Sequence, residues 1–247
     1  MRPAICIVAV KPHSVWLEML SKIQNYDVFI IVDTLNTEYG AFSAAYPSVQ
    51  IIQVTDRECR DRGFVNSSHM ENSSLVFNEI IAWDRALCYF STRDYETMWF
   101  FEEDAFFYNK ETIAAIDRQY PASDLLCADK ERESLPHEWQ WFWPAIHIEF
   151  PRPYFHAPIC ATRMSKRLLK EIANYAETHR TLFFIEAMFP TLCVHHQLLY
   201  DIPKELKDTI RWRHDWNTTN TDRMRIFHPI KDMGLQDAIR KNLISMM

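Results

Sequence analysis

Short hydrophobic runs bounded by polar residues recur along the first half of the chain. Residues 4–10, 27–33 and 49–54 each form such a run, rich in β-branched side chains. Residues 13–24, between the first two runs, place hydrophobic side chains at helical spacing. Runs of this length predict strands that are buried on both faces. The order strand, helix, strand therefore predicts an α/β protein whose central sheet is mostly parallel, with helices on its faces.

The most hydrophobic run, residues 98–109 (MWFFEEDAFFYN), is interrupted by three consecutive acids, Glu102, Glu103 and Asp104. Its aromatic flanks predict a central buried strand with the acids at its end. Carboxylates so close together repel one another, and a divalent cation bound by oxygen ligands would relieve that repulsion. The alternative is a charged turn between two strands, salt-bridged or solvated.

The pattern also predicts helices over residues 75–90, 110–119, 165–177 and 235–247 and a short strand over 125–128. Ser73 or Ser74 is the expected cap of the first of these helices, and residues 56–74 before it read as a long polar loop. We expect the C-terminal helix to pack on its own domain. Neither repeats nor a linker are evident, which favours one domain over residues 1–247.

The composition of the chain argues against some classes of function. The 247 residues are 48% hydrophobic, which indicates a globular chain with a substantial core. With only 3 glycines, the chain has none of the glycine-rich loops that cradle phosphates, so any phosphate must be held by other means. A net charge of -6 argues against a nucleic-acid-binding protein that relies on a broad basic surface.

The six cysteines form no CxxC pair, which argues against a zinc site. Their even number permits disulfides, but Cys6 and Cys88 lie in hydrophobic segments where buried free thiols are usual. The sequence shows no signal peptide before Cys6 and no hydrophobic run of transmembrane length. We therefore expect a cytoplasmic, reduced protein.

Several polar side chains follow the predicted strands. Lys11 and Asp33 stand at the ends of the first two, and parallel sheets bind ligands beyond the carboxyl ends of their strands. We expect these two residues to share a site with the acids at 102–104, although Asp33 alone is equally typical of a turn or cap. Later in the chain, His228 follows two hydrophobic residues and precedes Pro229. A lone histidine is usually structural, but this pattern suggests a strand end that is fixed for a ligand or phosphate contact.

Two further features suggest ligand contacts. Residues 136–158 are rich in aromatic side chains and broken by prolines, and their tryptophans, Trp139, Trp141 and Trp143, could stack on sugars or bases. Core packing is the alternative for any one of them. Glu186 lies in the hydrophobic segment 181–193, where a carboxyl group is either paired or poised for proton transfer.

Taken together, these segments resemble the metal-dependent nucleotide-sugar glycosyltransferases of the GT-A fold. The resemblance spans most of the chain and is carried by the following segments in order: AICIVAV, VDT at Asp33, AWDRAL at 82–87, WFFEEDAFF, DLLCADK at 124–130, FFIEAMFPTL at 183–192 and FHPIKD at 227–232. The family usually has an Asp-x-Asp motif, and this chain has Glu-Glu-Asp. The difference leaves open how many of the acids bind metal and whether metal is required.

The resemblance implies a single GT-A-like domain with a nucleotide-sugar-binding half (1–108) and an acceptor-binding half (109–247). It implies Mn²⁺ or Mg²⁺ bound by Asp104 and His228. The implied contacts with the nucleotide sugar, a UDP sugar in the commonest case, are Lys11, Asp33, Arg85, Glu102, Glu103, Asp104 and Lys231. Trp139, Trp141 and Trp143 would contact the acceptor, a glycan or another hydroxyl compound.

The resemblance also implies an activity: transfer of a sugar to an acceptor hydroxyl, in a carbohydrate-biosynthetic role. Glu186 would be the base of an inverting reaction, with Asp129 and Glu149 as competitors for that role. Two other functions stay open. A nucleotidyltransferase acting on sugar phosphates would use the same acids, and a non-catalytic carbohydrate-binding protein would use the tryptophans.

Overall fold

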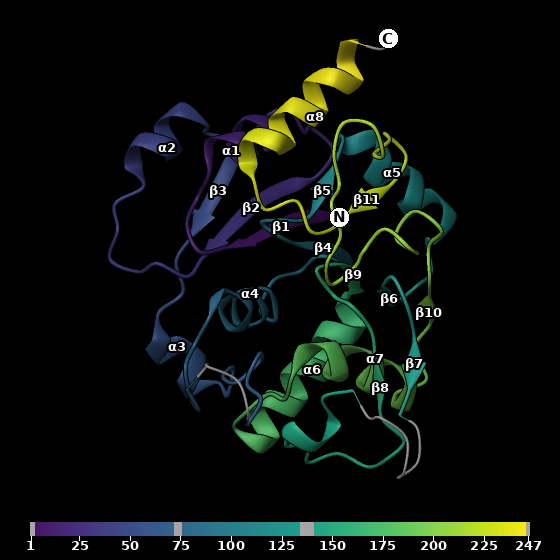
Figure 1. The fold of residues 1–247 in the computed structure, drawn as a ribbon. Helices are drawn as coiled ribbons and strands as arrows, with labels where there is room; N and C mark the ends of the chain where they lie inside the picture. The colour runs from purple at the N-terminus through teal and green to yellow at the C-terminus, as the bar shows by residue number, and fades with distance from the viewer. Residues whose placement is uncertain (1–2, 72–75, 134–140, 246–247) are drawn as a thin grey trace.

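A seven-stranded sheet crosses the middle of the molecule in the order β10-β6-β9-β4-β1-β2-β3 (Figure 1). This computed structural model describes residues 3–71, 76–133 and 141–245. The sheet strands are β1 (Ala4–Ala9), β2 (Asp27–Val32), β3 (Val49–Ile52), β4 (Thr97–Glu102), β6 (Leu125–Leu126), β9 (Ala161–Ser165) and β10 (Tyr200–Asp201). Only β9 runs antiparallel to its neighbours β4 and β6. The predicted α/β class and mostly parallel central sheet are thereby confirmed.

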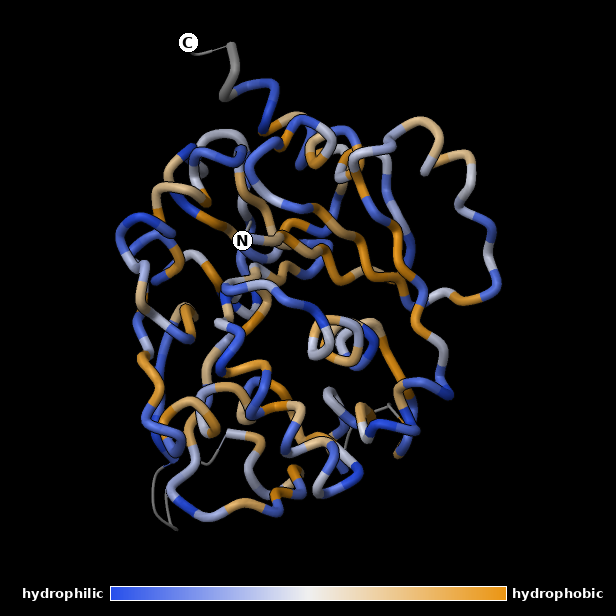
Figure 2. The backbone as a smooth tube through the Cα atoms, turned by 180° about the vertical axis from the view of Figure 1, so that it is seen from behind, coloured by the Kyte–Doolittle hydropathy of each residue, from blue (hydrophilic) through white to orange (hydrophobic). Residues whose placement is uncertain are grey.

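Helices cover both faces of the sheet (Figure 1). The helices are α1 (Ser14–Leu20), α2 (Gly40–Ala45), α3 (Asp56–Asp61), α4 (Ala82–Phe90), α5 (Lys110–Gln119), α6 (Lys166–His179), α7 (Ile185–His195) and α8 (Met233–Ser245), with a 3-10 turn η1 (Trp143–Ala145). Alternate strand residues enter two separate cores: Phe100 packs with α4, α6 and α7, whereas Trp99 and Phe101 pack with α1 and α5. Because both faces are covered, these strands are continuously hydrophobic, as the orange segments at the centre of Figure 2 show.

Two antiparallel pairs lie outside the main sheet. β5 (Phe106–Phe107) pairs with β11 (Ile226–Phe227), and β7 (Glu131–Arg132) pairs with β8 (Phe155–His156). The β5–β11 pair joins residues that are more than a hundred positions apart in the sequence. It brings the segment after β11, which contains His228, next to the acids at the end of β4.

The helix predicted over 75–90 begins instead at Ala82. Its first turn is capped by Asp84, whose carboxylate accepts a hydrogen bond from the Ile81 N–H at 2.9 Å. Asn78, four residues before the helix, has a φ of 67°, in the left-handed region that a right-handed helix cannot include. The predicted cap, Ser73 or Ser74, lies outside the described residues.

The predicted loop 56–74 contains a helix, α3, with a reciprocal capping box between Thr55 and Glu58. Strand β9 and helix α7 were likewise not predicted. The strand is short and contains polar residues such as Arg163, and the helix carries Pro190 inside it. Both features weaken the hydrophobic periodicity from which a strand or helix is predicted. Packing against the rest of the fold stabilises the two elements nevertheless.

Helix α8 packs on its own domain, as predicted, beginning two residues before the expected start. Ile239 is fully buried against Phe106 and Phe227, and Arg240 lies over the rings of Trp16 and Phe106. In the described part of the chain, no helix is both long and apolar enough to cross a membrane. The six cysteines are all free thiols.

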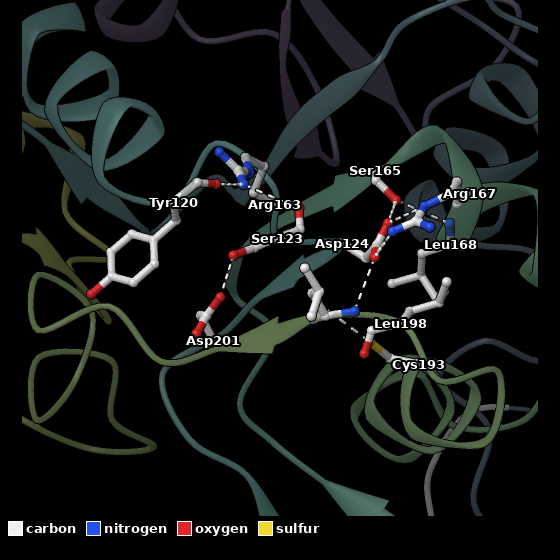
Figure 3. Close-up of polar contacts among 11 residues, drawn as sticks. Tyr120, Ser123, Asp124, Arg163, Ser165, Arg167, Leu168, Cys193, Leu198 and Asp201 are labelled. Atoms are coloured by element: carbon white, nitrogen blue, oxygen red, sulfur yellow. Dashed lines mark hydrogen bonds and ion pairs between the residues drawn. The ribbon is translucent and has the colours of Figure 1, made fainter.

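A buried carboxylate, Asp124, ties three elements together near one edge of the sheet (Figure 3). It accepts hydrogen bonds from the Ser165 hydroxyl, the Arg167 guanidinium and the Leu199 N–H, which come from β9, α6 and the start of β10. Burial alone would raise the pKa of Asp124, but the hydrogen bonds and the Arg167 charge outweigh it, and its pKa is lowered. The ionised carboxylate therefore stabilises the fold.

We expect Asp124→Asn to lower the free energy of unfolding by about 2–3 kcal/mol at pH 7, because charge-assisted hydrogen bonds are lost. The native pKa of Asp124 is depressed, so its contribution is present above the unfolded pKa and is lost as the pH falls through the native pKa. The difference between wild type and variant should accordingly shrink on acidification, as measured by urea unfolding at several pH values.

The matched control is Lys166→Ala, which removes an ion pair with Asp94 in which both side chains are mostly exposed. We expect a change below about 1 kcal/mol for this variant. A difference between Asp124→Asn and wild type that stayed constant down to acidic pH would contradict an ionised role for Asp124.

Candidate active site

The carboxyl ends of β1, β2 and β4 meet at a cavity of about 610 Å³. Lys11 and Asp33 reach it from just beyond β1 and β2, and Lys231 reaches it from the segment after β11. The three consecutive acids, Glu102, Glu103 and Asp104, complete the polar lining. Six of the predicted nucleotide-sugar contacts are thus gathered in one place, because parallel strands present their carboxyl ends at the same edge.

The acids occupy the turn between β4 and β5, so both sequence-based interpretations describe part of what is seen. Glu102 is the last residue of β4, and its carboxylate accepts a hydrogen bond from the Trp83 indole N–H at 2.9 Å. The Glu103 main-chain carbonyl accepts from the Trp16 indole and the Gln236 amide, at 2.9 and 3.0 Å. Burial raises the pKa of the Glu103 carboxyl group. The turn is therefore fixed from several elements.

His228 faces the acids from the opposite side. Its Nε2 lies 3.2 Å from Asp104 Oδ1 and 3.8 Å from Glu102 Oε2. Its Nδ1 lies 2.8 Å from the Arg211 carbonyl; because a carbonyl only accepts, Nδ1 carries the proton and Nε2 is the atom available to a ligand. Burial lowers the pKa of His228, but the hydrogen bond and charge of Asp104 outweigh it, and the pKa is raised overall.

The donor atoms at this point suit a divalent cation. Carboxylate oxygens and an imidazole nitrogen are ligands that Mn²⁺ accepts, and the histidine is oriented by a second hydrogen bond, as metal-bound histidines usually are. Glu102, His228 and Cys160 each offer one ligand atom, and these three atoms lie within 4.8 Å of one another. Sequence reasoning missed Cys160, since it stands alone in the sequence and only the fold brings it here.

Two further cavities continue from the first. One, of about 410 Å³, shares Glu102, Asp104 and Lys231 with the first cavity. The other cavity, of about 340 Å³, shares Cys160, Glu186 and His228 with the 410 Å³ cavity. The three cavities therefore adjoin one another, and together they are called the groove; His228 and the acids lie where they adjoin.

Glu186 lines the two cavities that lie beyond the acids, and it belongs to the first turn of α7. Burial, and secondly the charge of Glu102, raise its pKa to about 8, whereas His228 lowers it. Of its two competitors, Asp129 lines the 340 Å³ cavity. Glu149 is exposed on the surface, where it pairs with His147 and His179.

The aromatic residues divide between the core and the groove. Trp141 lines the 340 Å³ cavity and stacks on His156, with ring centroids 4.2 Å apart. Trp143 is only 8% exposed and packs in the core, and Trp139 lies outside the described residues. Trp212 is 71% exposed and lines both cavities beside Glu186. The sequence gives no signal for Trp212 beyond its type.

Arg85 lies beneath the first cavity rather than in its lining. Its guanidinium pairs with Asp33 at 3.2 Å and with Asp56 at 2.8 Å, and it donates to the Val54 carbonyl. The side chain is 5% exposed. The structure thus places Arg85 where it positions Asp33 for any ligand in the cavity.

Comparisons with known proteins identify no family. No protein-family model matches the chain, and no curated protein matches its sequence. Among solved structures, a 4-diphosphocytidyl-2C-methyl-D-erythritol synthase from Anaerococcus prevotii is similar, with a TM-score of 0.45 at 10% identity over 81% of this chain and 85% of that one. Mouse xyloside xylosyltransferase 1 is also similar, with a TM-score of 0.39 at 9% identity over 82% of this chain and 84% of that one. At these scores, neither similarity bears on function.

We expect Arg85→Met to lower the free energy of unfolding by about 1–3 kcal/mol, because Asp33, Asp56 and the Val54 carbonyl lose a shared charged donor. Urea unfolding at neutral pH measures the change. Arg57→Ala is the matched control on α3, since the Arg57–Asp61 pair has exposed fractions of 90% and 67%. Equal effects of the two substitutions would show that Arg85 does not hold this corner of the site.

Proposed function

We propose that this protein is a glycosyltransferase that moves a sugar from a nucleotide-diphosphate sugar to an acceptor hydroxyl. The observation that carries the proposal is the groove of adjoining cavities. At one end it combines lysines with carboxylates, and at the other it combines aromatic rings with Glu186. A reaction between a charged donor and a sugar-like acceptor requires two such ends, joined at one point.

The larger cavity suits the donor, which we propose to be UDP-linked. Lys11 and Lys231 supply positive charge for the diphosphate, and Asp33 offers a carboxylate for ribose or base hydroxyl and amine groups. Glu102, Asp104 and His228 would hold Mn²⁺ or Mg²⁺, which neutralises the diphosphate leaving group when bound. The two lysines and the cation would thus bind the diphosphate in place of a glycine-rich loop. Glu103 faces the same cavity, as a further contact for the nucleotide sugar.

At the junction of the groove, Glu186 is the base in this proposal. The acceptor oxygen attacks the anomeric carbon, the bond from that carbon to the diphosphate oxygen breaks, and the acceptor proton passes to the Glu186 carboxylate. Attack from the face opposite the leaving group inverts the anomeric centre. Glu186 is suited to this role because it lies beside the acids while lining the cavity on their far side.

The acceptor end offers flat hydrophobic surfaces. Trp141, stacked on His156, and the exposed Trp212 present rings that can pack against the faces of a sugar. Residues 1–108 thus supply most of the donor cavity and residues 109–247 the acceptor cavity. Lys231 comes from the second half to line the donor cavity, and His228 contacts Asp104 at its border.

We expect one nucleoside diphosphate, UDP in our proposal, to raise the thermal unfolding midpoint in the presence of Mn²⁺. A ligand that binds only the folded protein at a hundredfold excess over its Kd stabilises it by about 2.7 kcal/mol. Asp104→Ala should abolish the Mn²⁺-dependent part of this shift. Asp94→Ala, which changes an exposed acid outside the groove, should retain it.

Product analysis with the corresponding nucleotide sugar then identifies the reaction. Release of the nucleoside diphosphate together with a glycosylated acceptor supports the proposal. Pyrophosphate release from a nucleoside triphosphate and a sugar phosphate would instead identify a nucleotidyltransferase. A protein that binds sugars and no nucleotide would be a carbohydrate-binding protein without catalytic activity.

We expect Glu186→Gln to reduce kcat by about a hundredfold or more, because a general base typically contributes that much. A base acts only when ionised, so the wild-type rate should rise with pH as the Glu186 carboxyl group loses its proton, and this rise should be absent from the variant. The pKa of Glu186 is about 8 without a bound cation, and a bound cation lowers it. The matched control is Glu149→Gln, an exposed acid outside the groove. Wild-type transfer by Glu186→Gln would exclude Glu186 as the base.

A further inference from the structure

Cys160 stands beside the acids because of how β9 pairs with β4. The antiparallel register ends with Phe101 opposite Ala161, so the next pair places Glu102 opposite Cys160. The Glu102 N–H donates to the Cys160 carbonyl at 2.8 Å, which continues the ladder by one bond. The neighbourhood of the thiol and the carboxylate is therefore fixed by the sheet itself.

His228 brings an imidazole to the same point from the segment after β11. Its Nε2, the thiol of Cys160 and a carboxylate oxygen of Glu102 lie within 4.8 Å of one another. Bond lengths of about 2.0–2.3 Å to Zn²⁺ place tetrahedral ligands roughly 3.5 Å apart, so small side-chain rotations would close the cluster on an ion. Asp104 Oδ1, 3.2 Å from the same Nε2, is within reach as a further ligand.

We propose that Cys160 is a metal ligand and that the groove holds a mixed sulfur, nitrogen and oxygen site for a transition-metal ion. This inference rests on the proposed function in that the same cluster would hold the donor's cation. It changes the expected cation: a thiolate ligand favours Zn²⁺ or Co²⁺ over Mg²⁺, Ca²⁺ and Mn²⁺, for which oxygen ligands are better suited. On binding, the Cys160 thiol gives its proton to solvent and the sulfur bonds to the metal.

Titration of the metal-free protein with Co²⁺ tests the proposal without substrate or activity. A Co²⁺–thiolate bond produces a strong charge-transfer absorption in the near ultraviolet, which oxygen and nitrogen ligands do not produce. We expect this absorption in the wild type and its loss in Cys160→Ser. The matched control, Cys193→Ser, replaces a buried thiol near the Leu198 carbonyl, outside the cluster, and should keep the absorption.

Calorimetric titration with Zn²⁺ provides the affinity. We expect Cys160→Ser to weaken Zn²⁺ binding tenfold or more, while its circular dichroism and unfolding midpoint without metal stay close to wild type. Absence of the charge-transfer absorption in the wild type, or its persistence in Cys160→Ser, would overturn the proposal. Neither result depends on nucleotide binding, so a protein that binds Co²⁺ through Cys160 and yet transfers no sugar would refute only the proposed function.

Discussion

The pairing of β4 with β1 on one side and β9 on the other is the constraint on which the site depends. β4 is buried on both faces, and its register with β1 and β9 is fixed over five residue pairs on each side. A slip by one residue would exchange the two faces of the strand and move Glu102 away from the cavity. The packing of Trp99 and Phe100 into separate cores fixes the orientation of β4, and with it the position of the Glu102 carboxylate at the end of the strand.

The second constraint is electrostatic, because several carboxyl groups share one poorly solvated groove. Glu102 and Asp104 share His228, and Glu186 responds to the crowding by a pKa raised to about 8, chiefly through burial and then through Glu102. Such an arrangement favours a positively charged ligand near His228. A cation there would relieve the repulsion felt by Glu102, so a cation and an ionised Glu186 support each other.

Sequence patterns predicted the parts of this structure that arise from local signals. The hydrophobic runs located β1, β2 and β4, and the residues after them converge because parallel strands share an edge. Sequence patterns did not predict positions that depend on long-range contacts. Cys160 is placed by the pairing of β9 with β4, and Trp212 is placed by the bridge between Ile210 and His228. The ion pairs of Arg85 with Asp33 and Asp56 are a further long-range feature that the residue type alone does not indicate.

The order of the groove restricts how a reaction could run in it. His228 and Glu186 both line the two cavities on the far side of the acids, whereas Lys11 and Asp33 line only the first. A ligand with its phosphates near Lys11 and Lys231 would thus present its other end toward Glu186. A proposed acceptor stacked on Trp141 or Trp212 would reach that end through the other two cavities. In the proposed reaction the two substrates would meet beside Glu186, as an in-line, inverting displacement requires.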